Sequence, residues 1–378
     1  MITIQQTAGI SLNYPLERLG PAEKLLFFDI ETTGFSPVSS NLYLIGCIYP
    51  AGDGSWKMIQ WFADSPEAEA ECLEAFFSLA KERPILVHFN GDTFDLPYLL
   101  GRAQRLKIGA GLPQIESIDI FRKIRPCKKL LGMDSLKLKS IEQFLGIQRE
   151  DRYTGGQLIQ VYSDYLSTKS PARLQLLTLH NADDLRGMAA ILPILNYPDM
   201  LESAAGLTKE PAGQNPEKDA FYLSKWQLLT DNASQDASPA LQLDFAGSWH
   251  LPVPLERHGD FGWVSFCGSS ICCRIPLYQG SLKYFFPDYQ NYYYLPAEDM
   301  AVHKSVGTYV DKSSRKKATA RTCYIKKEGL FLPQPGPVWE PEFRLDFDSP
   351  QRFAAWSPEL LSDSQKACSY LKLLLDKL

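Results

Sequence analysis

Two acidic residues at the end of an apolar segment constrain this chain most. Residues 25–34 read LLFFDIETTG, an apolar run followed by polar residues and a glycine, which is typical of a buried strand that enters a turn. Asp29 and Glu31 are separated by one residue, so both side chains project from the same face of that strand. Carboxylates this close repel each other and are costly to keep ionised beside an apolar core. A divalent cation removes both costs, and hard oxygen ligands suit Mg²⁺ or Mn²⁺.

Two distant segments supply further acids. Asp95 follows the apolar run 84–91, at the carboxyl end of an expected strand, where the sites of open α/β sheets usually lie. Asp184 falls in a helix expected over 171–195, and His180 precedes it by four residues on the same helix face. Four carboxylates and a histidine fit two-metal phosphoryl transfer. His180 would then orient or deprotonate the attacking water.

Each of these residues also has a structural interpretation. Asp95 could instead cap the helix expected over 95–106, because Asp is favoured at that position. His180 alone would more often be a hydrogen-bonded helix histidine than a base. We interpret His88, which lies on the strand before Asp95, as structural.

The order of the expected elements indicates an α/β fold. Strands are expected over 25–34, 41–50, 56–63 and 84–91, and residues 116–122 are expected to form a short strand that runs into a helix. Further helices are expected over 65–84, 95–106, 134–145, 155–166 and 171–195. Strands that first meander and then alternate with helices predict a mixed sheet flanked by helices.

The chain changes character beyond about residue 200. Its 378 residues exceed the usual size of one domain. Two loop-like stretches, 206–219 and 230–240, bracket a short apolar segment, and short aromatic and β-branched runs follow. We therefore expect a first domain (1–200), a linker region (201–240) and a smaller β-rich accessory domain that ends in a helix (241–378).

The three acidic segments resemble those of a nuclease superfamily. FDIETTG resembles the first motif of the acidic-quartet (DEDD, DnaQ-like) 3′–5′ exonucleases, FNGDTFDLPYL the second and HNADD the third. The run from SIDIFR through SLKLKSIEQFLGIQREDRYTGGQ to LHNADDLRGMAAIL is similar to the bacterial YprB-like ribonuclease H-like family. The likeness covers about residues 23–196, and the order and spacing of its motifs are more specific than any single motif.

The resemblance implies a ribonuclease H-like domain with 3′–5′ exonuclease activity on single-stranded DNA or RNA. It implies that two Mg²⁺ or Mn²⁺ ions are held by Asp29, Glu31, Asp95 and Asp184. Exonuclease rather than endonuclease cleavage follows from the resemblance alone.

The third segment departs from the superfamily pattern. The commoner motifs are Tyr-x-x-x-Asp and His-x-x-x-x-Asp, whereas this chain has His-x-x-x-Asp over 180–184, next to the second acid Asp183. This departure and the aromatic second half leave an alternative open. The chain could be a nuclease-fold module that binds nucleic acid or a protein partner without turnover.

Two cationic clusters are candidate nucleic-acid contacts. The net charge of −5 argues against a basic coat protein but not against a nuclease, whose metal site is itself acidic. A charge run is usually a solvated face, although a nuclease must also hold phosphates. The clusters are Arg122, Lys123, Arg125, Lys128 and Lys129, and then Lys312, Arg315, Lys316, Lys317 and Arg321.

Aromatic residues near the second cluster could stack on bases, although packing within strands is the preferred interpretation. They are Tyr284, Phe285, Phe286, Tyr292, Tyr293 and Tyr294.

The remaining features favour the cytoplasm. The eight cysteines show no disulfide spacing, which fits free thiols in a reducing compartment. The N-terminus lacks the features of a signal peptide, and no window approaches the ~18 uninterrupted apolar residues of a membrane span. A phosphate-binding loop of the GxxxxGK[ST] type is absent from the sequence, which argues against an NTPase.

Overall fold

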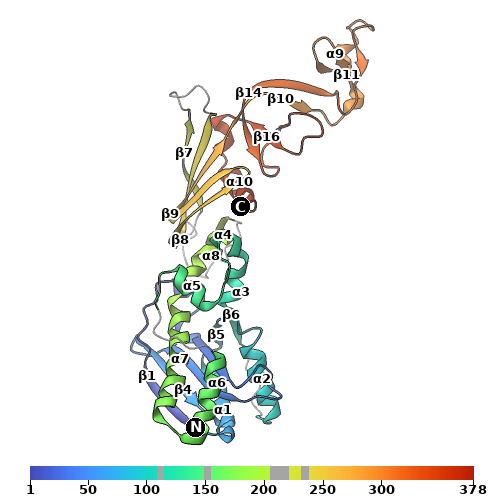
Figure 1. The fold of residues 1–378 in the computed structure, drawn as a ribbon. Helices are drawn as coiled ribbons and strands as arrows, with labels where there is room; N and C mark the ends of the chain where they lie inside the picture. Colours follow the sequence, from blue (N-terminus) through green and yellow to red (C-terminus); the bar gives the residue numbers. More distant parts are fainter. Residues whose placement is uncertain (109–114, 149–154, 205–220, 231–237) are drawn as a thin grey trace. The chain divides into compact units, whose positions relative to one another are not determined.

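The computed structural model describes residues 1–108, 115–148, 155–204, 221–230 and 238–378. The chain divides into two compact units, and each is described by itself (Figure 1). The first unit contains Met1–Pro198, and the second contains Pro254–Leu378.

The first unit is built on a six-stranded mixed sheet in the order β1-β4-β3-β2-β5-β6. The strands are β1 (Ile2–Thr7), β2 (Leu25–Thr32), β3 (Leu42–Pro50), β4 (Trp56–Phe62), β5 (Ile85–His88) and β6 (Glu116–Asp119). β2 pairs antiparallel with β3 and parallel with β5, and β5 pairs parallel with β6. This architecture confirms the predicted mixed sheet.

Helices lie in the order expected from the sequence. They are α1 (Glu69–Glu82), α2 (Asp95–Arg105), α3 (Ile120–Ile124), α4 (Lys128–Leu131), α5 (Leu138–Phe144), α6 (Gly155–Thr168), α7 (Pro171–Ala190) and α8 (Asn196–Ala204). The helix predicted over 171–195 is shorter than expected, because a 3-10 turn follows at Leu192–Leu195.

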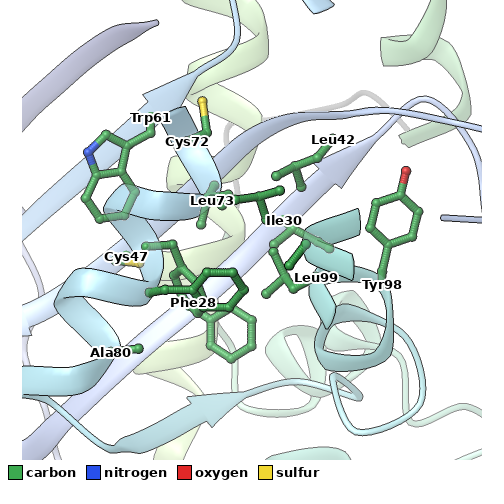
Figure 2. Close-up of a cluster of buried hydrophobic side chains, with 14 of the residues drawn as sticks. Phe28, Ile30, Leu42, Cys47, Trp61, Cys72, Leu73, Ala80, Tyr98 and Leu99 are labelled. Atoms are coloured by element: carbon green, nitrogen blue, oxygen red, sulfur yellow. The ribbon is translucent and has the colours of Figure 1, made fainter. Parts of the chain in front are cut away.

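Two apolar clusters cover the two faces of the sheet. One joins β2 and β3 to α1 and α2, and it includes Phe28, Cys72 and Leu99 (Figure 2). The other joins Tyr43 and Phe62 to residues of α6 and α7. Because β2 lies between these layers, its first four residues are apolar without alternation, and all four are fully buried.

The edge strand β1 was not predicted. It pairs antiparallel with β4, from Ile2 opposite Phe62 to Thr7 opposite Lys57. Most of its side chains are exposed, so the segment lacks the apolar signal on which sequence prediction depends.

The second unit is rich in β-structure, as predicted. It has three sheets, in the orders β7-β8-β9, β10-β14-β16-β15 and β12-β11-β13. Its elements are β7 (Tyr222–Leu229), β8 (Ala240–Gly259), β9 (Gly262–Pro276), β10 (Tyr278–Phe285), β11 (Tyr292–Leu295), β12 (Met300–His303), α9 (Lys304–Gly307), β13 (Lys316–Lys317), β14 (Tyr324–Gln334), β15 (Glu342–Phe343), β16 (Arg352–Ala355) and α10 (Ser364–Leu375).

One part of the expected linker is a strand. The two loop-like stretches fall mainly on residues 205–220 and 231–237, which lie outside the described residues. The apolar segment between them forms β7, which pairs antiparallel with β8. This segment is therefore part of a sheet, with its partners at residues 240–246 of β8. In the described part of the chain, no helix is long and apolar enough to span a membrane.

Candidate metal centre

The face of β2 that carries Asp29 and Glu31 is turned toward α7. Phe28 and Ile30 belong to the apolar cluster on the α1 and α2 side, so the alternate residues project to the opposite face. Gly46 lies opposite Asp29 on β3. A Cβ atom at Gly46 would lie 2.0 Å from the Asn181 Oδ1 atom of α7. The absence of a side chain there lets α7 approach the acidic pair closely.

Three side chains of α7, from His180, Asn181 and Asp184, depend on that approach. Asn181 Nδ2 donates to Asp29 Oδ2 at 2.9 Å, and Asn181 Oδ1 accepts from Gln60 Nε2 at 2.9 Å. His180 Nε2 lies 3.6 Å from Glu31 Oε1 and 3.6 Å from Asp184 Oδ2. One ligand atom from each of these last three residues falls within 4.8 Å of the others. The structure therefore brings together Glu31, His180 and Asp184.

Asp95 lies on the β5 side of β2, opposite to β3, because α2 follows β5 in the chain. It is the first residue of α2, and the N-cap position belongs to Phe94. Its buried carboxylate accepts hydrogen bonds from its own main-chain NH and from that of Ile30. The second bond ties the start of α2 directly to β2, between the two acids of that strand.

Burial and like charge act together on these acids. Removal from water raises the pKa of Asp29 well above its ordinary value, and Asp184, Glu31 and Asp95 raise it further. Burial raises the pKa of Asp95 to about 7, although the two NH donors oppose the shift. The carboxylates from three segments thus share one electrostatic environment. Oxygen donors under mutual repulsion fit divalent cations of the Mg²⁺ or Mn²⁺ type.

The neighbouring acid Asp183 faces a different partner. Its Oδ1 lies 3.5 Å from Arg186 Nη1, and Arg186 Nε donates to the carbonyl oxygen of Ala8 at 3.0 Å. Asp184, rather than Asp183, therefore lies with His180 and Glu31.

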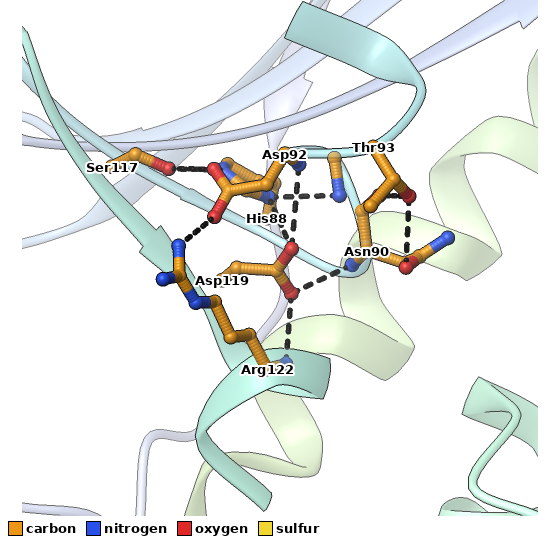
Figure 3. A network of polar contacts seen from close by, with 8 residues as sticks. His88, Asn90, Asp92, Thr93, Ser117, Asp119 and Arg122 are labelled. Atoms are coloured by element: carbon orange, nitrogen blue, oxygen red, sulfur yellow. Dashed lines mark hydrogen bonds and ion pairs between the residues drawn. The ribbon is translucent and has the colours of Figure 1, made fainter. Parts of the chain in front are cut away.

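A hydrogen-bond network fixes the turn between β5 and α2 (Figure 3). The Gly91 NH donates to His88 Nδ1 at 3.0 Å, so the proton of this neutral ring is on Nε2. That nitrogen lies 2.8 Å from Ser117 Oγ, which donates to Asp92 Oδ1 at 2.5 Å. Arg122 Nη1 donates to the other oxygen of Asp92 at 3.2 Å. Burial lowers the pKa of His88 and keeps the ring neutral.

Asp119 completes this network from the end of β6. Its carboxylate accepts from the main-chain NH groups of Asn90 at 2.9 Å, Asp92 at 3.3 Å and Arg122 at 3.2 Å (Figure 3). His88, Asp92 and Asp119 are close enough to hold an ion. Their facing atoms are already used in these hydrogen bonds, so the group is better explained as the support that sets the position of Asp95.

Sequence reasoning missed these supporting residues. Asn181, Ser117 and Asp119 fall inside the runs that carry the family resemblance, but single-sequence patterns give no sign of their partners. Asn181 reaches Asp29 across 152 positions of sequence, and Ser117 reaches Asp92 across 25.

The first cationic cluster is exposed at α3 and α4. Arg122 is held by Asp92, although its side chain is 81% exposed. Lys123, Arg125, Lys128 and Lys129 are exposed, and the last three line an open hollow with Gly132 and Asp134.

The second cluster lies in the second unit, on and around β13. Arg321 forms an ion pair with Asp348, and the Arg315 guanidinium lies 4.6 Å from the ring centroid of Tyr293. Lys312, Lys316 and Lys317 are exposed.

Comparisons with known proteins agree with the fold of the first unit. Residues 26–196 match the family model described as RNase_H superfamily. A DNA polymerase of Pyrococcus glycovorans is 33% identical over 93 residues, a match that covers 22% of this chain and 12% of that polymerase. DNA polymerase 1 of Saccharolobus solfataricus is 41% identical over 71 residues, which covers 19% of this chain and 8% of that protein. The chain thus matches only a small part of the length of these relatives.

A solved family B DNA polymerase from Pyrobaculum calidifontis is also similar. It has a TM-score of 0.37 and 15% sequence identity, over 72% of this chain and 35% of that chain. A similarity this loose carries no argument of its own. Residues 26–196 are thus similar to the ribonuclease H superfamily, and the mixed sheet flanked by helices agrees with that similarity.

The raised pKa of Asp95 predicts a pH-dependent cost in metal-free protein. In the folded state the pKa of this carboxyl is about 7, so the carboxyl keeps its proton up to about that pH. In the unfolded chain the carboxyl loses its proton near pH 3.8, its ordinary pKa. Its stabilising contribution is therefore complete below pH 3.8 and is lost as the pH rises through 7. In EDTA at pH 8, we expect Asp95→Asn to raise the Tm of the first unit by roughly 2–4 °C, or about 1 kcal/mol.

The gain in Tm should shrink steadily as the pH is lowered toward 4. In excess Mn²⁺ the wild-type protein should have a higher Tm than Asp95→Asn. Thermal melts followed by circular dichroism measure both effects. Asp183→Asn is the matched control and should give no gain, because it removes the ion pair with Arg186. A Tm difference that is the same at every pH would contradict the assignment.

The network predicts that Ser117→Ala weakens cation binding. The substitution removes the link between His88 and Asp92 and loosens the turn that leads to Asp95. Loss of such a supporting contact typically costs about 10- to 100-fold in metal affinity. Mn²⁺ titration calorimetry measures it, with Ser167→Ala on the exposed side of α6 as control. A less stable variant with unchanged Mn²⁺ affinity would show that the network is structural only.

Proposed function

We propose that the first unit is a two-metal-ion nuclease that removes nucleotides from the 3′ ends of single-stranded DNA or RNA. One observation carries the proposal: carboxylates from β2, α2 and α7 share one buried environment beside His180, within a ribonuclease H-like domain. Within that superfamily, we propose membership of the YprB-like family on the motifs of the sequence. The 3′–5′ direction rests on the same resemblance.

The residues fit the metals that this chemistry requires. Asp29, Glu31, Asp95 and Asp184 would hold two Mg²⁺ or Mn²⁺ ions, which stabilise the attacking and leaving oxygens of an in-line displacement. The chain supplies the proton acceptor. We assign this role to His180, because its Nε2 lies 3.6 Å from both Glu31 Oε1 and Asp184 Oδ2 and is therefore next to the acids that would hold the attacking water.

The unusual spacing of the third motif is compatible with this role. Residues four apart on a helix share one face, and His180 and Asp184 both reach Glu31 from α7. The spacing therefore keeps the histidine beside the carboxylates.

An exposed ring beside the site supports unpaired nucleic acid as the substrate. Phe35, in the segment between β2 and β3, is 92% exposed. Its ring centroid lies 6.1 Å from that of Phe94, the residue before Asp95. An exposed aromatic ring this close to the acids can stack on a substrate base. The exposed cations Lys123, Arg125, Lys128 and Lys129 would contact phosphates of the same strand.

Hydrolysis of end-labelled oligonucleotides tests the activity. With Mn²⁺ we expect 5′-labelled single strands to shorten progressively from the 3′ end, and EDTA to abolish the reaction. Asp29→Ala should lower kcat at least ~100-fold, because it removes charge stabilisation of the transition state. Asp53→Ala, an exposed acid of the β3–β4 turn, should leave activity unchanged.

Internal cleavage without shortening would refute the exonuclease mode. Tight binding of DNA or RNA at millimolar Mn²⁺ without any cleavage would refute the enzyme and favour the alternative, a module that binds without turnover.

Phe35→Ala should weaken substrate binding more than chemistry. Loss of one stacked base costs about 1–3 kcal/mol, so we expect KM for single strands to rise roughly 5- to 100-fold while kcat changes little. Phe35→Trp should restore the wild-type KM. Steady-state kinetics on a short oligonucleotide separate the two constants, and an unchanged KM in the alanine variant would disprove the stacking role.

A further inference from the structure

A small sheet in the second unit has two different faces. β11 is its central strand, and Tyr293 lies opposite both Val302 of β12 and Lys317 of β13. Residues directly opposite each other in antiparallel strands project to the same side. Tyr293, Val302 and Lys317 therefore share one face, whereas Tyr294 and its partner Lys316 share the other.

The face of Tyr294 is turned inward. Tyr292 stacks on Phe286 with ring centroids 4.5 Å apart, and both pack with Tyr294 against buried Cys323. Tyr294 also donates its hydroxyl to Asp299 at 2.6 Å. The tyrosines that the sequence offered as base-stacking residues are thus largely packing residues.

The other face carries α9 and a group of cations. α9 lies on Tyr293 and Val302, since a Cβ atom on Gly307 would come within 2.9 Å and 3.0 Å of their side chains. The Arg315 guanidinium is 4.6 Å and Lys304 Nζ is 5.9 Å from the Tyr293 ring centroid. We call this surface the α9 face; it comprises Lys304, Val306, Arg315 and Lys317, and we include Tyr309 and Lys312 because they lie in the segment that connects α9 to Arg315.

Exposed apolar groups accompany these charges. Tyr309 follows α9 by two residues and is 91% exposed, and Val306 on α9 is 63% exposed. A ring this exposed gains nothing from the core of the unit, so its surface is free for a ligand.

Positive charge on this face is not neutralised by the protein. Asp311 is the one acid between Lys304 and Lys317, and five cations fall in the same segment, of which Lys316 lies on the other face. Among the described residues, Arg321 is paired with Asp348 and Lys326 with Asp299, but Lys312 and Lys317 have no ion-pair partner. The α9 face therefore presents lysines without an ion-pair partner among the described residues, together with an exposed ring, in a protein whose net charge is −5.

We propose that the α9 face binds single-stranded nucleic acid, with Tyr309 stacked on a base and the lysines on phosphates. Cations interleaved with an exposed ring are the combination that recognises unpaired strands without reading their sequence. An acidic protein would satisfy the lysines but would leave the tyrosine ring without a flat partner. The inference rests on the proposed function for its ligand class, but it concerns binding rather than cleavage.

The test uses the full chain with Asp29→Asn, in EDTA, so that the strand stays intact. Fluorescence anisotropy with labelled (dT)20 and (U)20 across a salt series gives the affinity and its salt slope. Lys312→Gln with Lys317→Gln should weaken binding about tenfold and reduce the slope by about 1.4, which is ~0.7 for each phosphate contact on a single strand. The control pair, Lys316→Gln with Lys327→Gln, removes the same charge away from this face and should change affinity less than about twofold.

The ring is tested separately. Tyr309→Ala should weaken binding at least about fivefold with little change in salt slope, and Tyr309→Phe should bind as the wild type does. An equal loss of affinity in the two double lysine variants would overturn the proposal, and so would an unchanged affinity in Tyr309→Ala. Binding of a polyglutamate peptide, without binding of either oligonucleotide, would also overturn the proposal.

The two proposals fail in different ways. Binding through the α9 face without Mn²⁺-dependent cleavage by the wild-type chain would refute the nuclease alone. Normal cleavage with normal binding by all α9-face variants would refute the inference alone.

Discussion

The close contact between α7 and β2 is the constraint on which the candidate site depends. Asn181 bonds the carboxylate of Asp29 with one end of its amide and accepts from Gln60 with the other. Gly46 makes room for this amide, because any side chain there would collide with it. Once α7 is held at this distance, His180 in the same turn and Asp184 in the next lie beside Glu31. The helix position and the acidic cluster are therefore set by the same interaction.

The opposite side of the site is fixed by main-chain hydrogen bonds rather than by packing alone. Asp119 holds the NH groups of the turn after β5, and Asp95 in turn accepts from the NH of Ile30 on β2. Two carboxylates with different tasks thus meet at neighbouring strand ends. Asp119 accepts from three NH groups and organises the backbone of the turn, whereas burial raises the pKa of Asp95, the carboxyl that we propose as a cation ligand.

What could be predicted from the sequence depended on whether the signal for a residue is local or comes from a distant segment. Asp29, Glu31 and the buried strand that carries them were readable because the signal is local: an apolar run followed by acids at alternate positions. The partners Asn181 and Ser117 were not, because their hydrogen bonds connect segments distant in sequence. The same limit applies to β7, whose strand character depends on β8, and to Lys316 and Lys317. These adjacent lysines look equivalent in the sequence, and only the register with β11 assigns them to opposite faces.

The charge distribution also explains how an acidic chain can serve a polyanion. At physiological ionic strength, charges farther apart than about 8 Å are largely screened, so the net charge of −5 says little about the α9 face or about the cations after α3. At the carboxylate cluster a different constraint applies: burial and the neighbouring acids raise the pKa of Asp29, so these carboxylates are costly to ionise together without a cation that neutralises them. Under the proposed function, cations would hold a strand without divalent ions, whereas cleavage would need the ions at the acids. Binding and cleavage would then be separable events, and the metal requirement would belong to the second.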